Sequence, residues 1–351
     1  MSWDLLVDRS DHTRTSLVET AAADLAPGQV RLRVDRVGMS ANNVTYAVLG
    51  DLLRYWEFFP ATEGWGRVPL WGFCEVEEST VAELVPGARF FGYLPTSSHL
   101  VVEPERVGAK GFRDGAAHRR SLPPVYNRLT ATAGDPSYEP GREDLLAVYR
   151  PLFMTSFVLA DFLLDNAFFG AQAVVLSSAS SRTAYGTAYL LEGVHRVGLT
   201  SPGNAAFVRS LGCYDEVVTY DDLRLPSSPA VYVDVAGDQV LRRRVHEAVP
   251  LVHSAVVGAA HHDAAPDPSA EGLPGPQPAF FFAPDQVRKR SAEWGPEGVD
   301  AAHAKAWERF APWLESWVEV RTGSGPEGLR EAWLAALAGR EDPRVARVVA
   351  L

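Results

Sequence analysis

The sequence contains little cysteine: only Cys74 and Cys213 occur in 351 residues, and they lie far apart. Neither belongs to a C-x-x-C pair or to another spacing typical of a metal site, so cysteine cannot build a zinc site here. The N-terminus lacks a basic segment followed by an apolar run, and no stretch approaches the roughly 18 apolar residues of a membrane span. We therefore expect a cytoplasmic protein with reduced thiols and no membrane partner.

Positive charge is also scarce. Lys and Arg number 33 against 44 Asp and Glu, which gives a formal net charge of −11. Nucleic acids and anionic membrane surfaces are bound through clustered Lys and Arg, and the one basic cluster, Arg242–Arg244, is typical of a solvated helix face. These features argue against a nucleic-acid partner. The length and the 46% hydrophobic content predict a globular chain of about two domains.

The first part of the chain is predicted to be rich in β-strands. Apolar Val30, Leu32 and Val34 alternate with polar residues, as in a half-buried strand. Pro and Gly turns separate this strand from others, which indicates a sandwich or barrel. The expected strands are Gln29–Asn43, Val68–Glu77, Ala88–Leu94 and His99–Glu103. We expect Ser121–Glu143, rich in Pro, Thr, Gly and Asp, to be a long loop.

The second part alternates between helices and buried strands. A mostly apolar helix is expected at Arg150–Phe169, and Ala301–Trp317 carries large apolar residues at helical spacing, typical of core or subunit packing. Strands separated by helix-length segments predict a parallel sheet covered on both faces. The expected strands are Ala173–Leu176, Arg196–Thr200, Glu216–Val218, Ala230–Val235 and Ser254–Gly258. The Pro- and Gly-rich segment His262–Pro278 is expected to be a loop.

Glycine is missing where a dinucleotide-binding turn normally has it. Strand Ala173–Leu176 is followed by small residues and then by a helical segment, the layout of such a turn, but Ser178, Ser181 and Ala184 hold the G-x-x-G-x-x-G positions. Serine is small and brings a hydroxyl donor, so phosphate binding at the helix N-terminus is one interpretation. A serine-rich turn without a ligand is the other.

Two motifs in order resemble the signature of the DUF2855 family. They are RPLFMTSFVLADFLLDN, Arg150–Asn166, and SSASSRTA, Ser177–Ala184. More broadly, the chain resembles the medium-chain dehydrogenase/reductase superfamily, in particular its zinc-independent quinone-oxidoreductase-like branch. The segments that carry this broader resemblance are Val30–Gly50, Val68–Ser79, Val217–Leu223 and Val231–Asp238.

The resemblance implies an α/β fold of two domains. A β-rich GroES-like catalytic or substrate domain would span residues 1–150, with residues 300–351 returning to it, and a Rossmann-like nucleotide-binding domain would span residues 151–300. Ser40 and Phe73 stand where zinc members have a cysteine and a histidine, so the resemblance implies no catalytic metal. The cluster His261–His262–Asp263 is expected to be an ordinary loop segment. The superfamily also leads us to expect a homodimer.

Candidate catalytic residues lie on segments that the resemblance places in the cleft. Tyr46, Tyr55 and Asn43, with the neighbouring Asn42, are candidates for donating a proton or orienting a carbonyl; each tyrosine could equally be a packing residue. Thr155, followed by Ser156, falls where related enzymes place a threonine near the nicotinamide, and its hydroxyl could instead bond to its own helix. Tyr126 and Asn127 could cover the substrate or simply anchor their loop.

The cofactor is expected to be NADP rather than NAD. NAD-specific folds carry an acidic residue after the second strand, whereas Thr200 and Ser201 follow it here, and Arg182 or Arg209 could add positive charge. The residues expected to bind the cofactor are Ser178, Ser180, Ser181, Arg182, Thr183, Thr200, Ser201, Tyr220, Ala236 and Gly258.

The sequence thus favours a zinc-independent, NADP(H)-dependent oxidoreductase that reduces a carbonyl or an activated alkene. Aromatic residues near the expected cleft suggest a small apolar or aromatic substrate, although such a cluster is also typical of a core; they are Tyr55, Trp56, Phe58, Phe59 and Trp65. The alternative is a catalytically silent ligand-binding or scaffold protein that keeps the dehydrogenase fold. Lyase or hydrolase chemistry would need a serine close to a base such as His99 or His253.

Overall fold

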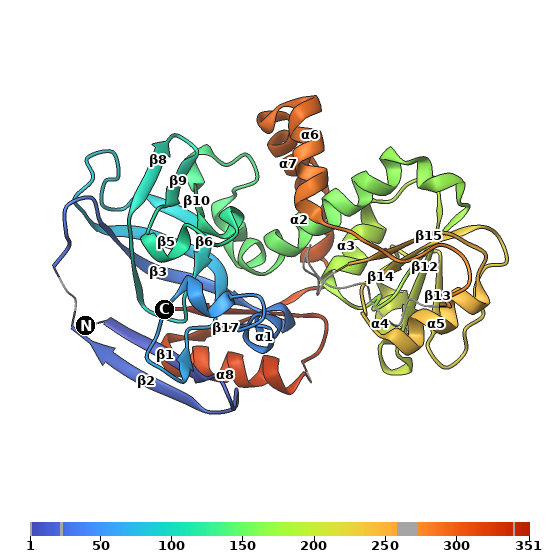
Figure 1. The fold of residues 1–351 in the computed structure, drawn as a ribbon, viewed down its shortest axis with the longest axis horizontal. Coiled ribbons are helices and arrows are strands. Elements are labelled where there is room, and N and C mark those ends of the chain that lie inside the picture. Colours follow the sequence, from blue (N-terminus) through green and yellow to red (C-terminus); the bar gives the residue numbers. More distant parts are fainter. Residues whose placement is uncertain (1, 22–23, 258–271, 340) are drawn as a thin grey trace. The chain divides into compact units, whose positions relative to one another are not determined.

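The computed structural model describes residues 2–21, 24–257, 272–339 and 341–351. The chain divides into two compact units (Figure 1). We call Met1–Arg150 with Trp313–Leu351 the β-rich unit, and Pro151–Pro312 the parallel-sheet unit. The predicted α/β fold class is confirmed, because one unit is built on a mostly antiparallel β-sheet and the other on a parallel sheet.

The β-rich unit contains a three-stranded and a nine-stranded sheet among the described residues. The small sheet has the order β2-β1-β4, from β2 (Thr15–Thr20), β1 (Ser2–Asp8) and β4 (Trp65–Gly66). The large sheet has the order β17-β18-β3-β5-β6-β10-β9-β8, and β7 also pairs with β3. Its strands are β3 (Val30–Met39), β5 (Leu70–Ser79), β6 (Arg89–Leu94), β7 (His99–Val102), β8 (Pro104–Gly108), β9 (Gly111–Asp114), β10 (Arg128–Ala131), β17 (Glu319–Ser324) and β18 (Val345–Ala350).

Alternating burial organises this unit as the sequence predicts. Val30, Leu32 and Val34 on β3 are completely buried and belong to one core cluster with Trp333 of helix α8 (Gly325–Ala338). A second helix, α1 (Ala41–Val48), follows β3 directly. The expected strand Gln29–Asn43 therefore ends earlier than predicted, because Ser40 caps α1.

The expected loop Ser121–Glu143 is not a plain loop. It contains β10, which pairs with β6 and β9 and buries Leu129. A strand of four residues is too short for its alternation to stand out among turn residues. Sheet pairing, which depends on distant segments, decides this region.

In its described residues, the parallel-sheet unit has six strands in the order β13-β12-β11-β14-β15-β16, and all of their pairings are parallel. The strands are β11 (Ala173–Leu176), β12 (His195–Thr200), β13 (Glu216–Thr219), β14 (Ala230–Asp234), β15 (Leu251–Val256) and β16 (Ala279–Phe280). Helices α3 (Arg182–Leu190), α4 (Ala205–Ser210), α5 (Gln239–Ala248), α6 (Ala283–Trp294) and α7 (Pro296–Glu315) accompany them. The predicted strands agree closely, except that β15 begins three residues before the predicted Ser254. Trp307 of α7 is buried, in agreement with a core role.

Helix α2 (Glu143–Asp165) begins before and ends before the predicted helix Arg150–Phe169. At its end, Ala167, Phe168 and Phe169 have φ angles of 47°, 52° and 55°, which form a left-handed turn closed by Gly170. This backbone conformation costs about 1–2 kcal/mol for each residue other than glycine. The apolar period of the sequence continues through this turn, so it could not reveal where the helix stops.

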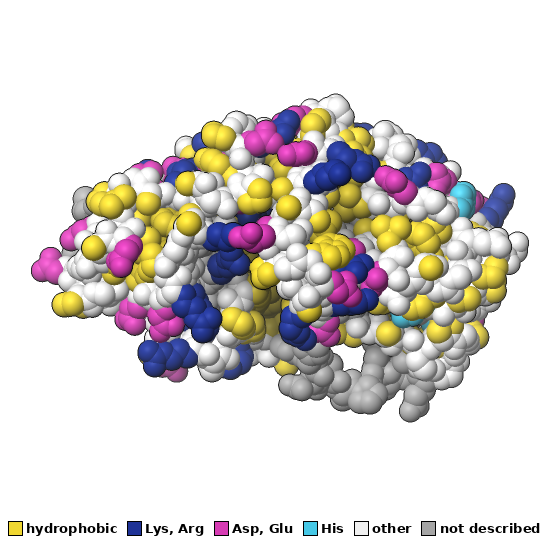
Figure 2. All heavy atoms as spheres, turned by 90° about the horizontal axis from the view of Figure 1, so that it is seen from above, with side chains coloured by type: hydrophobic (Ala, Val, Ile, Leu, Met, Phe, Trp, Pro, Cys, Tyr) yellow, Lys and Arg dark blue, Asp and Glu magenta, His cyan; other side chains and the backbone are white. Residues whose placement is uncertain are grey.

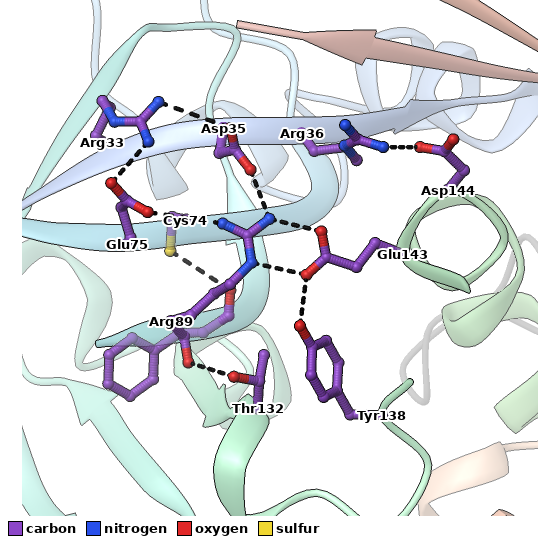
Figure 3. A network of polar contacts seen from close by, with 11 residues as sticks. Arg33, Asp35, Arg36, Cys74, Glu75, Arg89, Thr132, Tyr138, Glu143 and Asp144 are labelled. Atoms are coloured by element: carbon purple, nitrogen blue, oxygen red, sulfur yellow. Dashed lines mark hydrogen bonds and ion pairs between the residues drawn. The ribbon is translucent and has the colours of Figure 1, made fainter. Parts of the chain in front are cut away.

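Charged side chains tie the first turn of α2 to the large sheet (Figure 3). Arg89 of β6 donates two hydrogen bonds of 2.7 Å to the carboxylate of Glu143 and also pairs with Asp35 of β3. Arg36 pairs with Asp144. Acidic side chains also interact favourably with the positive end of a helix dipole, so this network fixes where α2 begins.

One helical stretch, Pro140–Asp165, is long and apolar enough to cross a membrane by length and composition, and it is the only such stretch in the described part of the chain. This differs from the expectation that no segment approaches a membrane span. In the structure, 56% of its most apolar window is buried within the protein. That burial is the property of a core helix.

On the face shown in Figure 2, basic and acidic side chains are interspersed among apolar ones. The prediction that Arg242–Arg244 is a solvated cluster is wrong for Arg242. Arg242 is 4% exposed, and its guanidinium pairs at 2.7 Å with Asp234, which is completely buried.

Candidate functional site

The hydroxyl of Ser177 connects the turn between β11 and α3 to the end of β14 by hydrogen bonds. This hydroxyl donates to Asp234 Oδ1 at 3.0 Å and accepts from the amides of Val235 and Ala236 at 2.9 and 3.0 Å. Asp234 in turn is fixed by Arg242. The predicted residue Ala236 is therefore locked to the turn through its backbone, and Ser177 is a positioning residue that the sequence pattern did not single out.

Ser178 stands where a dinucleotide-binding turn has its first glycine. Its backbone is left-handed, with φ = 51°. Glycine adopts this conformation without steric cost, and serine does not. The amide of Ser178 donates to the hydroxyl of Tyr220 at 3.0 Å. Two of the predicted residues thus contact each other directly, and burial raises the pKa of Tyr220, so its hydroxyl stays protonated.

The rest of the turn presents backbone donors. Ser181 is the N-cap of α3, and its side chain accepts from the amide of Ala184 at 3.3 Å. Ser180 Oγ accepts from Asn204 Nδ2 at 3.1 Å. The amides of Ser180 and Thr183 have no hydrogen-bond acceptor within the described residues. Uncompensated amides at a helix N-terminus, with Arg182 beside them, form a site suited to an anion.

A hollow of about 290 Å³ lies next to this turn. Its lining residues include the predicted Tyr220 and Ala236, together with Asp238, Val240, Leu241 and Arg244. Thr200 is buried, its carbonyl accepts from the amide of Tyr220 at 2.9 Å, and Ser201 follows it. The predicted Gly258 and the cluster His261–His262–Asp263 lie outside the described residues.

In the β-rich unit, Asn43 is buried with both ends of its amide bonded to the backbone. Its Oδ1 accepts from the amide of Ser40 at 2.8 Å, and its Nδ2 donates to the carbonyl of Pro69 at 2.9 Å. These bonds close the capping box of α1. Asn43 therefore fixes the first turn of its own helix, α1.

Tyr46 has the geometry of a hydrogen-bond donor. Its oxygen accepts from Asn42 Nδ2 at 2.7 Å and from Trp71 Nε1 at 3.1 Å, while its own proton has no acceptor among the described residues. Burial raises the pKa of Tyr46, and the two hydrogen bonds oppose that rise only in part. The phenol therefore remains protonated at neutral pH, with its O–H available.

Tyr46 lies in a cluster of tyrosines. The ring centroids of Tyr55, Tyr93 and Tyr126 lie 4.6, 5.5 and 6.5 Å from that of Tyr46. The hydroxyls of Tyr55 and Tyr126 are 3.5 Å apart, and burial raises the pKa of both. The predicted Tyr126 thus belongs to the same cluster, whereas Asn127 donates to the carbonyl of Arg119 at 3.0 Å and anchors its loop.

Sequence reasoning missed Tyr93 and the adjacent ion pair. The Tyr93 hydroxyl is buried without a partner within the described residues. Arg119 and Asp114, each 1% exposed, approach to 3.0 Å, and the guanidinium lies 4.6 Å from the Phe59 ring. Tyr93, Asp114 and Arg119 lie far from Tyr46 in the sequence, so no residue spacing could predict that they meet. The tyrosines Tyr46, Tyr55 and Tyr126, already candidates, were a partial indication of the cluster.

Thr155 and Ser156 lie well inside α2. The Thr155 hydroxyl donates to the carbonyl of Pro151 at 3.4 Å, and that of Ser156 donates to the carbonyls of Leu152 and Thr183. A side chain at Gly186 would meet Ser156 Oγ at 2.6 Å. Ser156 therefore sets the close approach of α2 to α3, and Thr155 bonds to its own helix.

The serine and histidine arrangements differ from a catalytic pair. Ser98 Oγ lies 2.8 Å from His99 Nδ1, but it also accepts from the amide of Trp3 at 2.9 Å and is buried. His253 instead stacks on Phe169.

The described residues contain no group of three metal-ligating side chains. At the two positions where zinc members have ligands, Ser40 caps α1 and Phe73 is buried in the core.

The fold of this chain is similar to that of several solved structures. Over 100% of this chain and 99% of the other, it superposes on CurA from Vibrio vulnificus in complex with NADPH, with a TM-score of 0.62 and 13% identity. S. aureus TarJ in complex with NADPH gives a TM-score of 0.61 at 9% identity, covering 99% and 98%. A putative NADPH:quinone reductase from Mesorhizobium loti gives 0.61 at 13% identity, covering 100% and 98%.

Residues 37–342 match the model of DUF2855, described as a protein of unknown function. The chain belongs to this family, in agreement with the two motifs at Arg150–Asn166 and Ser177–Ala184. No curated protein matches the sequence. The similar structures share too little identity to show more than the fold.

Proposed function

We propose that the protein is an NADPH-dependent reductase of a carbonyl or an activated alkene, in which the parallel-sheet unit binds the cofactor. The observation that carries this proposal is the turn after β11, which leaves the amides of Ser180 and Thr183 without acceptors at the N-terminus of α3. Similar folds that hold NADPH support it.

The residues present fit a dinucleotide. Ser180, Arg182 and Thr183 would bind the pyrophosphate through amides and a guanidinium. The hollow beside Tyr220 and Arg244 would take the adenosine half, where the absence of an acid after β12 favours a 2′-phosphate. When bound, the nicotinamide supplies a hydride.

The β-rich unit would supply the proton. Tyr46 is the best donor, because Asn42 and Trp71 occupy its oxygen as acceptor and leave its O–H without a partner among the described residues. An aromatic neighbourhood of Tyr55, Tyr93 and Tyr126 excludes water and favours an apolar substrate. No metal is part of this proposal.

Titration of the purified protein with NADPH, followed by nicotinamide fluorescence, tests the proposal. We expect saturable binding, tighter for NADPH than for NADH, and oxidation of NADPH by members of a quinone and enone panel. Tyr46→Phe should keep the affinity for NADPH and lower kcat by roughly 10²- to 10⁴-fold, the usual contribution of general acid catalysis. No binding of either nucleotide at millimolar concentration would refute the proposal.

One observation favours the catalytically silent alternative. The Tyr220 hydroxyl already accepts the hydrogen bond of the Ser178 amide, which a phosphate oxygen could otherwise accept. In a scaffold protein this contact would persist, and neither NADPH nor NADH would change the melting temperature. A melting temperature that keeps rising with the logarithm of the NADPH concentration excludes a scaffold that binds no nucleotide, and turnover of NADPH by the quinone and enone panel excludes a catalytically silent binding protein.

A further inference from the structure

A second hollow, of about 250 Å³, lies in the parallel-sheet unit and shares no residue with the one beside Tyr220. Strands β15 and β16 and helices α2 and α6 supply its walls. Its lining residues are Phe162, His253, Ala255, Ala279, Phe280, Phe281, Phe282, Asp285, Gln286 and Lys289. The lining is thus mainly aromatic and aliphatic, and Phe280 is exposed at the rim.

His253 is the polar group of this hollow without a partner. Neither ring nitrogen has a hydrogen-bond partner in the described part of the chain. Burial lowers the pKa of His253, so the imidazole is neutral and offers one N–H donor and one nitrogen acceptor. A half-buried imidazole beside an aromatic hollow leaves a hydrogen bond that a ligand could complete.

The strained turn after α2 fixes this imidazole. Phe169, the third left-handed residue, stacks on His253 with ring centroids 3.9 Å apart and an interplanar angle of 9°. Phe162 lies 5.9 Å from the imidazole and 5.3 Å from Phe281. Strained backbone persists where the surroundings determine it, and it is concentrated at functional sites.

The charged and amide groups at the rim already have partners. Lys289 pairs with Asp165, Asp285 pairs with Arg288, and Gln286 donates to Asp161. No unpaired charge therefore faces the hollow from the described residues, which favours a neutral ligand over an ion.

We propose that this hollow binds a small, neutral, planar aromatic molecule that carries a hydroxyl group. The ring lies among Phe162, Phe280 and Phe281, and the hydroxyl exchanges a hydrogen bond with His253. A cavity of about 150 Å³ already holds benzene, so the larger hollow accepts one or two fused rings. This site is separate from the cofactor turn and does not depend on the proposed reductase activity.

Calorimetric titration with 4-methylphenol and with 1,4-dimethylbenzene, which has a methyl group in place of the hydroxyl, tests the role of His253. His253→Phe keeps the ring that stacks on Phe169 and removes both nitrogens. We expect it to lower the affinity for 4-methylphenol by about three- to tenfold, the usual effect of one hydrogen bond, and to leave that for dimethylbenzene unchanged. No saturable binding of either probe up to its solubility limit, or an equal effect on both, overturns the proposal.

A second variant locates the binding. Ala279→Trp fills the hollow from the edge strand β16 and should abolish binding of both probes without changing the melting temperature or the NADPH titration. Ala301→Trp, at an exposed position of α7, is the matched control and should bind both probes normally. Unchanged binding by Ala279→Trp overturns the proposal. Conversion of a dimer to a monomer by Ala279→Trp, seen by analytical ultracentrifugation, also overturns it, because a second copy would then be the occupant.

Discussion

The tyrosine cluster of the β-rich unit and the serine turn of the parallel-sheet unit present hydrogen-bond donors in different ways. Around Tyr46 the donors are phenol and indole side chains, which are buried or partly buried. In the turn the donors are the amides of Ser180 and Thr183, which any side chain would leave in place. The cluster therefore depends on which residues meet, whereas the turn depends on the path of the backbone.

Single substitutions in the two regions should therefore change different properties of the protein. Changes in the cluster should act on stability and on proton transfer. Changes in the turn should act on anion binding and leave the fold intact.

The largest effect is expected from Asp114→Ala. It would leave the guanidinium of Arg119, 1% exposed, without its carboxylate. Breaking a buried ion pair in this way costs about 3–5 kcal/mol, which urea unfolding can measure. Asp222→Ala, which breaks the exposed pair with Arg224, is the control and should cost less than about 1 kcal/mol. If both variants lost the same free energy of unfolding, the buried pair would stabilise the fold no more than the exposed pair does.

In the turn, Ser181→Asp should weaken NADPH binding by about 100-fold. Aspartate caps a helix as well as serine does, so α3 should remain folded, but its charge would lie beside the pyrophosphate. At about 5 Å and an effective dielectric constant near 20, that repulsion is about 3 kcal/mol. Ser181→Asn adds no charge and should change the affinity only slightly, as measured by fluorescence titration. Equal affinities of the aspartate and asparagine variants would place the phosphates elsewhere.

The cluster should make the protein sensitive to alkaline pH. Burial raises the pKa of Tyr46, Tyr93 and Tyr126 above the usual value near 10, so these phenols stay protonated in the folded state while they ionise in the unfolded chain. Their contribution is complete below pH 10 and is lost above it, by up to about 1.4 kcal/mol per pH unit for each tyrosine.

Urea unfolding between pH 9 and pH 11.5 measures this slope. Tyr93→Phe removes one of the phenols, whose hydroxyl has no partner within the described residues, and should reduce the slope by up to one tyrosine's share. An unchanged slope would show that Tyr93 ionises normally in the folded protein.

The smallest effect is expected from Ser178→Gly. Glycine adopts the φ angle of 51° without steric cost, which relieves up to about 1 kcal/mol, less the added entropy of the unfolded chain. NADPH affinity should hardly change, because the amide remains. Ser180→Gly, at a residue without positive φ, is the control and should be destabilising. A loss of stability in Ser178→Gly as large as in Ser180→Gly would show that the turn is not strained.

The sequence revealed much of the turn, because its signals are local. The buried run Ala173–Leu176 and the small residues after it predict a strand, a turn and a helix, and β11 and α3 lie there. The hydrogen bond between Ser178 and Tyr220 could not be predicted, since it depends on how β13 lies beside β12.

The tyrosine cluster was only partly predictable. Tyr46 and Tyr55 were candidates because the resemblance places their segment in the cleft. Tyr93 lies on β6, Asp114 ends β9 and Arg119 lies in the short 3-10 helix that follows, and only sheet pairing brings them together. The left-handed turn at Phe169 was hidden for a related reason, because apolar periodicity is the same for a helix and for its left-handed end.

In the proposed function, backbone amides of the serine turn bind the cofactor. The most direct test is an NADPH titration of ¹⁵N-labelled protein that follows the amide resonances of Ser180 and Thr183. We predict that these two amides shift downfield and saturate together, as donors do when they gain a phosphate acceptor. Saturable shifts confined to other residues, or no shift at millimolar NADPH, would contradict the account.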